Sequence, residues 1–245
     1  MNERQAMFVR RHHQRIAQVL LTLDGAALLQ HQCLFGGGTA IALRYGEYRE
    51  SVDMDFLVAD ISSYRQLRML TTGPDGIAAL FKYPSSLITQ TQEVRADQYG
   101  IRTMLQVDGH QVKFEIILEG RMRLQPGSAE ASICGVATLS PLDTVASKLL
   151  ANSDRWVDSG VFNRDLIDLA MIQPSRDLLC QAIAKAEQAY GQAIVRDLGK
   201  AIDKCRQPGW LDRCMRAMEI DVPKAVLWKN IRQLQRVITR LSAAE

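Results

Sequence analysis

The sequence predicts an α+β protein with a mixed sheet, followed by a region that is helical throughout. Strand-like segments occur before residue 139, an Asp-Gly turn joins two of them, and helical periodicity runs on from residue 140. We therefore expect an α/β core over residues 1–139 and a helical domain over residues 140–245.

Short helices and turns fill the first part of the core, because apolar residues recur there at helical spacing and are punctuated by glycines. The predicted elements are, in order, a helix Arg4–Leu23, a short helix to Gln32, a strand Cys33–Phe35, a turn Gly36–Gly38 and a helix Thr39–Tyr45 closed by Gly46. A strand and a helix therefore flank the glycine turn.

Extended segments follow. In "SVDMDFLVA" the apolar Val52, Met54 and Phe56 alternate with Asp53 and Asp55, which predicts a strand with one polar face. A helical pattern over residues 62–81 is interrupted at "TTGPDG". Next, "IRTMLQVDGHQVKFEIIL" predicts a hairpin that turns at Asp-Gly.

The helical region begins at "LSPLDTVASKLLAN". Ser140 suits the N-cap position and Pro141 the first helical position. Two long helical patterns follow, Arg176–Arg206 and Val222–Ala244, separated by "QPGW" and "DVP".

Composition narrows the class of protein. The chain has 245 residues with a 47% apolar fraction, enough for a packed core. No run reaches the roughly 18 apolar residues that cross a bilayer, and the first residues are polar, so we expect a cytoplasmic protein with no membrane contact. The net charge of +3 permits a nucleic-acid partner without requiring one.

Cysteine and histidine residues give no sign of a structural metal site. The cysteines are odd in number and form no CxxC pair, which favours reduced thiols. His12 and His13 are adjacent and diverge by about 100° on a helix, a poor geometry for chelation. The five cysteines are Cys33, Cys134, Cys180, Cys205 and Cys214.

Asp53 and Asp55 are the first candidates for chemistry, because residues i and i+2 of a strand point to one face. At about 4 Å and an effective dielectric near 20, their repulsion is on the order of 4 kcal/mol. One carboxyl could be protonated, both could turn to solvent, or a divalent cation could bind between them. Magnesium suits an open site that offers only oxygen ligands.

The glycine turn beside these acids suggests a phosphate-binding site. Gly37 and Gly38 let the backbone approach a ligand closely, and the following helix offers free N–H groups to phosphate. The hydroxyl of Thr39 could add a donor. The simpler interpretation is a turn with no ligand.

A third acid, Glu115, lies on the second strand of the predicted hairpin. It could pair with Lys113 on the same face, or act at the metal site. If the hairpin lies beside the strand of Asp53, three acids converge at one edge. That is the two-metal arrangement for nucleotidyl transfer, in which two magnesium ions activate the attacking hydroxyl and hold the triphosphate.

The segment "GGTAIALRYGEYRESVDMDF" resembles the signature of the AbiEii/AbiGii-type nucleotidyltransferases. These belong to the DNA-polymerase-β-like superfamily and are toxins of type IV toxin–antitoxin and phage-defence systems. Downstream, "SKLLAN" and "RDLIDL" resemble the family's lysine helix and RDxxDL helix, so the resemblance spans roughly residues 34–171. The chain has one extra residue between Arg49 and Ser51, so no role is carried over to Arg49.

The resemblance implies a polymerase-β-like nucleotidyltransferase domain whose site is completed by the helical domain. It implies that Lys148 contacts the triphosphate and that Asp165 orients that lysine or the nucleotide, with Asp168 as the second choice. The alternatives without a function are a solvated side chain for Lys148 and, for Asp165 and Asp168, a pair of carboxylates stabilised at a helix N-terminus. The implied catalytic set is Asp53, Asp55, Glu115, Lys148 and Asp165, with the first three as metal ligands, and the implied nucleotide-binding set is Gly37, Gly38, Thr39, Ser51 and Lys148.

The expected activity is magnesium-dependent transfer of a nucleoside monophosphate from a nucleoside triphosphate to an acceptor hydroxyl. The resemblance implies RNA as acceptor, at the 3′ end of transfer RNA, and an antitoxin from an adjacent gene. The alternatives are transfer to a small molecule or a protein, and a non-catalytic binder of nucleotide or protein. A chain that keeps two repelling aspartates argues against the last.

Basic residues offer two places for an RNA acceptor. One stripe on the last predicted helix has steps of three and four residues, and its default interpretation is a solvated face. Arg121 and Arg123, just after the hairpin, could contact phosphates without reading sequence. The stripe consists of Lys229, Arg232, Arg236 and Arg240.

Overall fold

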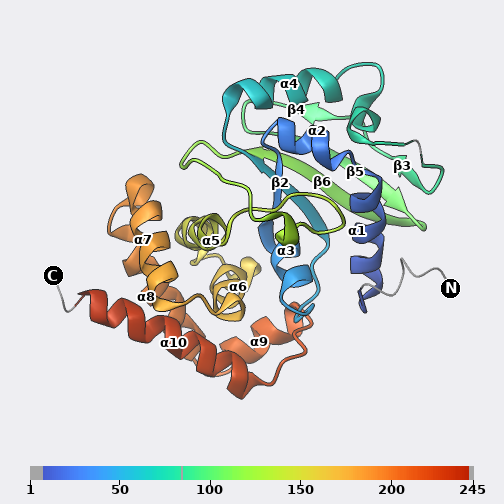
Figure 1. Cartoon of the computed structure of the whole chain (residues 1–245). Coiled ribbons are helices and arrows are strands. Elements are labelled where there is room, and N and C mark those ends of the chain that lie inside the picture. The colour runs from blue at the N-terminus through green and yellow to red at the C-terminus, as the bar shows by residue number, and fades with distance from the viewer. Residues whose placement is uncertain (1–7, 84, 243–245) are drawn as a thin grey trace. The chain divides into compact units, whose positions relative to one another are not determined.

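The computed structural model describes residues 8–83 and 85–242, which form two compact units (Figure 1). The first unit takes the chain up to Glu47 together with Ser51–Ser140. The second takes Tyr48–Glu50 and the chain from Pro141 onward. The three-residue segment Tyr48–Glu50 therefore groups with the helical part, whereas the sequence placed it in the core.

The first unit contains a mixed sheet, which confirms the predicted fold class. Within the described residues its strand order is β1-β2-β6-β5-β3, with β4 paired to β5. Strands β2 and β6 are parallel and the other pairs are antiparallel. The strands are β1 Leu34–Gly36, β2 Asp53–Val58, β3 Ile88–Gln90, β4 Arg95–Ala96, β5 Gly100–Val107 and β6 His110–Leu118.

The predicted hairpin is confirmed as β5 and β6. Asp108 and Gly109 have φ values of 48° and 76°, the positive angles that a two-residue turn between twisted strands requires. Strands β3 and β4 were not predicted, because pairing fixes only three and two residues there, too few to show an alternation.

The helices of this unit match the predicted order with shifted ends. The first begins at Arg11, because Arg10 is extended and its N–H donates to Glu47. The third begins at Gly37, two residues before the predicted start, so it absorbs most of the glycine turn. The described helices are α1 Arg11–Thr22, α2 Gly25–Gln30, α3 Gly37–Arg44 and α4 Ile61–Thr71, with 3-10 turns Gly76–Leu80 and Ala129–Ala131. Residues 4–7 of the predicted first helix lie outside the described part.

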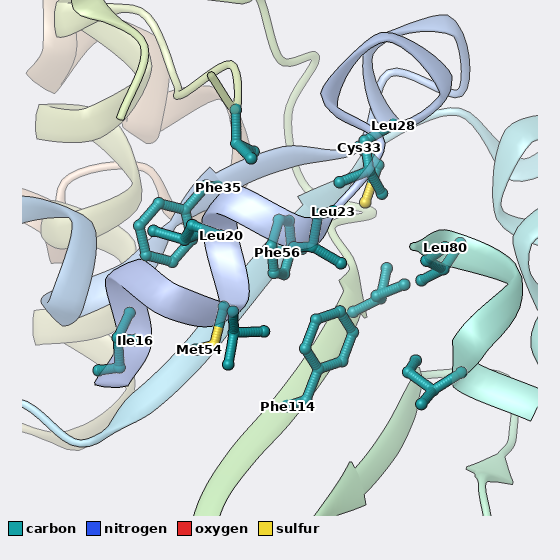
Figure 2. Close-up of a cluster of buried hydrophobic side chains, with 14 of the residues drawn as sticks. Ile16, Leu20, Leu23, Leu28, Cys33, Phe35, Met54, Phe56, Leu80 and Phe114 are labelled. Carbon is teal, nitrogen blue, oxygen red and sulfur yellow. The ribbon is translucent and has the colours of Figure 1, made fainter. Parts of the chain in front are cut away.

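The core of the first unit lies on one face of the sheet (Figure 2). Phe56 of β2 packs between Phe35 and Phe114, with ring centroids 5.3 Å and 5.0 Å away. Residues of α1, including Ile16 and Leu20, are fully buried in the same cluster. Because strand side chains alternate, burial of this face directs the odd-numbered residues of β2 to the other face.

The second unit is helical, as predicted. Helix α5 begins at Pro141 and packs against α6, α7 and α8, while α10 packs against α6 and α8. The predicted run Arg176–Arg206 is broken at Gly191, whose φ of 56° and ψ of −149° end α7. The helices are α5 Pro141–Arg155, α6 Arg164–Ile172, α7 Arg176–Tyr190, α8 Ala193–Arg206, α9 Trp210–Ala217 and α10 Lys224–Ser242, with a 3-10 turn Ser159–Val161.

The end of the predicted last helix, at residues 243 and 244, lies outside the described residues. Among the helices that the structure describes, none combines the length and apolar character needed to cross a membrane.

Candidate active site

Strand β2 places Asp53 and Asp55 on the face of the sheet opposite the aromatic core. Both are half-buried, whereas Met54 and Phe56 between and beside them are fully buried. In the sheet register Asp55 lies opposite Gly36 of β1 on one side and Glu115 of β6 on the other. The predicted hairpin therefore does lie beside the strand of Asp53, with the third acid in register with the second.

Gly37 is needed where it stands for two reasons. Its φ of +67° lies in the left-handed region, and a Cβ built on it would lie 2.4 Å from the Oδ2 atom of Asp55. The missing side chain thus lets the start of α3 approach the Asp55 carboxylate. Within the described part of the chain, no side chain caps this helix N-terminus, so its first amides are not bound by a capping group.

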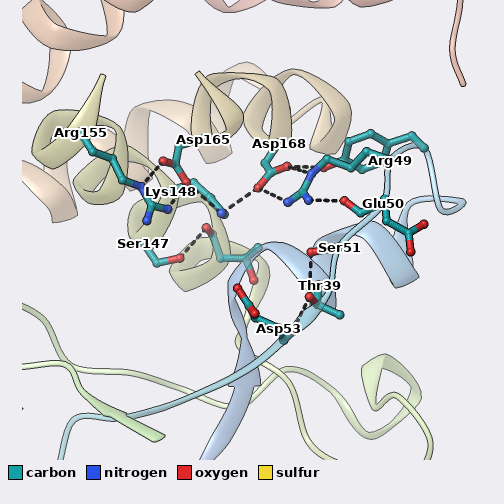
Figure 3. Close-up of polar contacts among 12 residues, drawn as sticks. Thr39, Arg49, Glu50, Ser51, Asp53, Ser147, Lys148, Arg155, Asp165 and Asp168 are labelled. Carbon is teal, nitrogen blue, oxygen red and sulfur yellow. Dashed lines mark hydrogen bonds and ion pairs between the residues drawn. The ribbon is translucent and has the colours of Figure 1, made fainter. Parts of the chain in front are cut away.

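Thr39 and Ser51 hold α3 to the start of β2. The Thr39 hydroxyl donates to the carbonyl oxygen of Asp53 at 2.5 Å, and the two hydroxyls lie 2.7 Å apart (Figure 3). Because Thr39 has only one hydroxyl proton, Ser51 must be the donor in the second bond. Thr39, the predicted phosphate donor, and Ser51, of the implied nucleotide-binding set, therefore both use their hydroxyl protons within the unit, and both side chains are buried.

Glu115 is paired with two cations. Its carboxylate oxygens lie 2.5 Å from the Nζ atom of Lys113 and 3.0 Å from the Nε atom of Arg102. Arg102 also bonds to Asp97 at 3.0 Å. The pairing with Lys113 that the sequence left open is present, and a second partner from β5 was not foreseen.

A magnesium ion fits the two aspartates by donor chemistry, because both offer carboxylate oxygens on one face and Gly37 leaves the space beside Asp55 clear. The residues described in the structure contain no group of three or more His, Cys, Asp or Glu side chains that could hold a metal. A third ligand from Glu115 would require its carboxylate to leave Lys113 and Arg102.

In the second unit Lys148 joins the two acids of α6. Its Nζ atom lies 3.0 Å from Asp165 and 2.7 Å from Asp168 (Figure 3). Arg155 also bonds to Asp165, at 2.7 Å and 2.9 Å. The lysine and both carboxylates are nearly or fully buried. The alternative of a solvated lysine is therefore wrong. Asp165 does lie in the first turn of α6, as the alternative of a carboxylate pair at a helix N-terminus expects, but both acids are buried in ion pairs.

Arg49 is a partner that the sequence did not assign. It donates to both carboxylate oxygens of Asp168, at 2.8 Å and 3.1 Å, and the Tyr48 hydroxyl donates to the same carboxylate at 2.5 Å. Asp168 is thus the more heavily bonded of the two acids. The sequence signal for this contact is Arg49 itself, which corresponds to the arginine of the family signature but is separated from Ser51 by one extra residue.

The charges of this cluster stabilise one another. Burial opposes ionisation of Asp168, yet Arg49 and Lys148 outweigh it and hold the pKa of this carboxyl below its usual range. Asp165 behaves likewise, since Lys148 and Arg155 overcome its burial and lower its pKa. Burial and the Asp168 charge raise the pKa of Tyr48 well above its usual value, which keeps the phenol a donor.

The basic residues considered for RNA differ in availability. Arg121 and Arg123 are both exposed, but the guanidinium of Arg121 bonds to both oxygens of Glu119, at 2.8 Å and 2.6 Å. All four basic residues of the predicted stripe are exposed on α10. A hollow of about 310 Å³ is lined by Arg232, Gln235, Arg236, Thr239 and Arg240.

A mixed sheet with two aspartates beside a glycine-led helix, followed by a helical unit with a buried lysine, is the arrangement expected of a nucleotidyltransferase. The chain belongs to the AbiEii family of nucleotidyl transferase toxins of type IV toxin–antitoxin systems, whose family model matches residues 19–236. Membership implies a nucleotide substrate and an antitoxin partner.

Two solved structures from Helicobacter pylori share the fold. One, assigned as a nucleotidyltransferase, is 14% identical with a TM-score of 0.50, over 100% of this chain and 99% of the other. The second, JHP933, is 15% identical with a TM-score of 0.51, over 97% of both chains. A comparison with curated proteins gives no match.

Proposed function

We propose that this protein transfers a nucleoside monophosphate from a nucleoside triphosphate to a hydroxyl of RNA, at the 3′ end of transfer RNA, in a magnesium-dependent reaction. The observation that carries the proposal is the pair Asp53 and Asp55, which are half-buried on one face of the sheet, with Asp55 directly beside Gly37 at the N-terminus of α3. Carboxylates bind the cation and helix amides bind phosphate, so the two features suit a metal-bound triphosphate.

Each residue of the proposed site has a distinct task. Asp53 and Asp55 would hold the metal, with Glu115 as third ligand once released from Lys113 and Arg102. The bound magnesium, as two ions, supplies charge that lowers the pKa of the acceptor hydroxyl and stabilises the leaving pyrophosphate. The amides of Gly37, Gly38 and Thr39 would bind phosphate oxygens.

The Thr39 and Ser51 hydroxyls would serve this site by fixing α3 to β2, since their protons are used between them and Asp53. Lys148 would bind the triphosphate, and Asp165 would hold that lysine in place. Nucleoside triphosphates and transfer RNA are cytoplasmic, so we place the reaction in the cytoplasm.

The test is to incubate the purified protein with each of the four α-³²P-labelled nucleoside triphosphates, magnesium and total RNA. Products are separated on a denaturing gel before and after protease treatment. We expect label in RNA of transfer-RNA size, and we expect Asp53→Ala to abolish it because the metal site loses a ligand. Asp75→Ala, which changes an exposed acid in a turn, is the matched control and should retain full activity.

Other outcomes separate the alternatives. Label removed by protease would identify a protein acceptor, and labelled small products would identify a small-molecule acceptor. Full activity in purified Asp53→Ala would contradict the assignment of Asp53 as a metal ligand.

A further inference from the structure

We propose that His13, assisted by His12, is a positioning residue that holds the chain segment entering β2 so that Asp53 and Asp55 are presented to the metal. The proposal rests on the proposed function for the identity of the site. Its evidence is a set of hydrogen bonds within the first unit. They bind the backbone of three successive residues, Ser51, Val52 and Asp53.

His13 is fully buried and bonds on both sides of its ring. The backbone N–H of Ser51 donates to its Nε2 atom at 3.2 Å, and its Nδ1 atom lies 2.8 Å from Oε1 of Glu47. Because Nε2 accepts a hydrogen, the ring proton must lie on Nδ1 and point to the carboxylate. The bond to Glu47 therefore selects the tautomer that can hold Ser51.

Glu47 is itself held in place. Its carboxylate accepts from the backbone N–H groups of Val9 at 2.7 Å and Arg10 at 3.0 Å. Although partial burial opposes ionisation, these bonds and His13 lower the pKa of Glu47. The carboxylate that orients His13 is thus an ionised, well-bonded acceptor, like the outer partner of a metal-binding histidine.

His12 reaches the next peptide unit. Its Nε2 atom lies 3.0 Å from the carbonyl oxygen of Val52, which can only accept, so the Nε2 atom of His12 carries a proton. Adjacent residues of a helix diverge by about 100°. That divergence, which makes the pair poor chelators, lets two neighbouring rings bind two successive peptide units of another segment.

The third contact comes from α3. Thr39 donates to the carbonyl oxygen of Asp53. The backbone groups of Ser51, Val52 and Asp53 are therefore each bound by a side chain from α1 or α3, at residues where strand β2 is only beginning. A metal site is weakened when its ligands move by as little as about 1 Å. Loosening the segment Ser51–Asp53 should therefore weaken metal binding without removing a ligand.

The test compares two substitutions of the same residue. In His13→Gln the terminal amide reaches the place of Nε2 and can still accept from Ser51, whereas in His13→Asn the shorter amide reaches only the place of Nδ1 and Glu47. We expect His13→Asn to weaken Mn²⁺ binding and lower kcat by about 10-fold or more, with KM for RNA unchanged, and His13→Gln to stay close to wild type. His110→Asn, at the exposed hairpin turn, is the control.

Amide hydrogen exchange gives a readout that needs neither metal nor substrate. We expect faster exchange of the peptide that contains Ser51 and Val52 in His13→Asn but not in His13→Gln. A merely structural role in the core would lower the melting temperature of both variants and leave the ratio of their Mn²⁺ affinities near one.

The proposal is overturned if His13→Asn keeps wild-type exchange at Ser51, or if both variants lose Mn²⁺ affinity equally. A wild-type protein that neither binds Mn²⁺ nor labels any acceptor would instead overturn the proposed function, and the metal role of His13 with it. Retained labelling and Mn²⁺ binding in His13→Asn would overturn the positioning role alone.

Discussion

The side-chain cations of Lys113 and Arg102 compete with the proposed metal ion for the carboxylate of Glu115. Single substitutions can measure this competition. The Glu115 carboxylate is already bound by Lys113 and Arg102, while its register partner Asp55 belongs to the proposed metal site. A magnesium ion carries twice the charge of the lysine and prefers carboxylate oxygens. Because both carboxylate oxygens are already bound, the metal would have to displace Lys113 and Arg102 before Glu115 could serve as third ligand.

We expect Lys113→Met to lower the magnesium concentration needed for half-maximal transfer several-fold, because one competitor for Glu115 is removed. Glu115→Gln should raise that concentration and reduce kcat, since an amide is a weaker ligand than a carboxylate. Activity measured across a magnesium titration checks both. Lys82→Met, the same change away from the acids, is the control. An unchanged magnesium requirement in Glu115→Gln would restrict Glu115 to its ion pairs.

At the scale of elements, helix α6 depends on charges that come from outside it. Asp168 is fully buried and binds Arg49, Lys148 and Tyr48. Removing one member of a buried pair leaves the other charge uncompensated, which costs about 3–5 kcal/mol. An exposed pair such as Lys224 and Asp212 contributes no more than about 1 kcal/mol.

We expect Asp168→Asn to lower the free energy of unfolding by about 3–5 kcal/mol near neutral pH. The folded pKa of Asp168 lies below its unfolded value of about 3.9, so this contribution is present above that pH and is lost as pH falls further. The difference between wild type and variant should therefore narrow below pH of about 4.

Urea unfolding of the full chain at a series of pH values measures this difference, with Asp212→Asn as the exposed control. A gap between wild type and Asp168→Asn that stays constant as the solution is acidified would show that the charge of Asp168 is not what stabilises the unit.

The elements also show what the sequence could and could not predict. Alternation placed Asp53 and Asp55 on one face, the Asp-Gly turn gave the hairpin, and Pro141 gave the start of α5, because each signal is local. The Arg49 to Asp168 pair spans 119 residues, and no local pattern encodes such a distance. The direction of the Thr39 hydroxyl depends on where β2 packs. Its hydrogen bond to the carbonyl oxygen of Asp53 therefore could not be predicted from the sequence either.

At the scale of the whole molecule, the distribution of charge matters more than the sum. The net charge of +3 is small, yet α10 carries an exposed row of basic residues on the face opposite its buried Leu227, Ile231 and Leu234. Many other basic side chains form ion pairs with acidic residues, as Arg121 does with Glu119. A concentrated row on one helix is the charge pattern that a phosphate backbone would meet.

If RNA binds along α10, the double substitution Arg232→Ala and Arg236→Ala should raise KM for RNA several-fold and leave kcat and KM for the nucleotide unchanged, because it removes charges that face phosphates and alters no chemistry. The slope of log KM against log salt should fall by about one for each phosphate that the protein no longer neutralises. Lys224→Ala, a cation on the same helix paired with Asp212, is the matched control. An unaltered salt slope would place the RNA elsewhere, and the exposed Arg123 beyond the hairpin would then be the next residue to change.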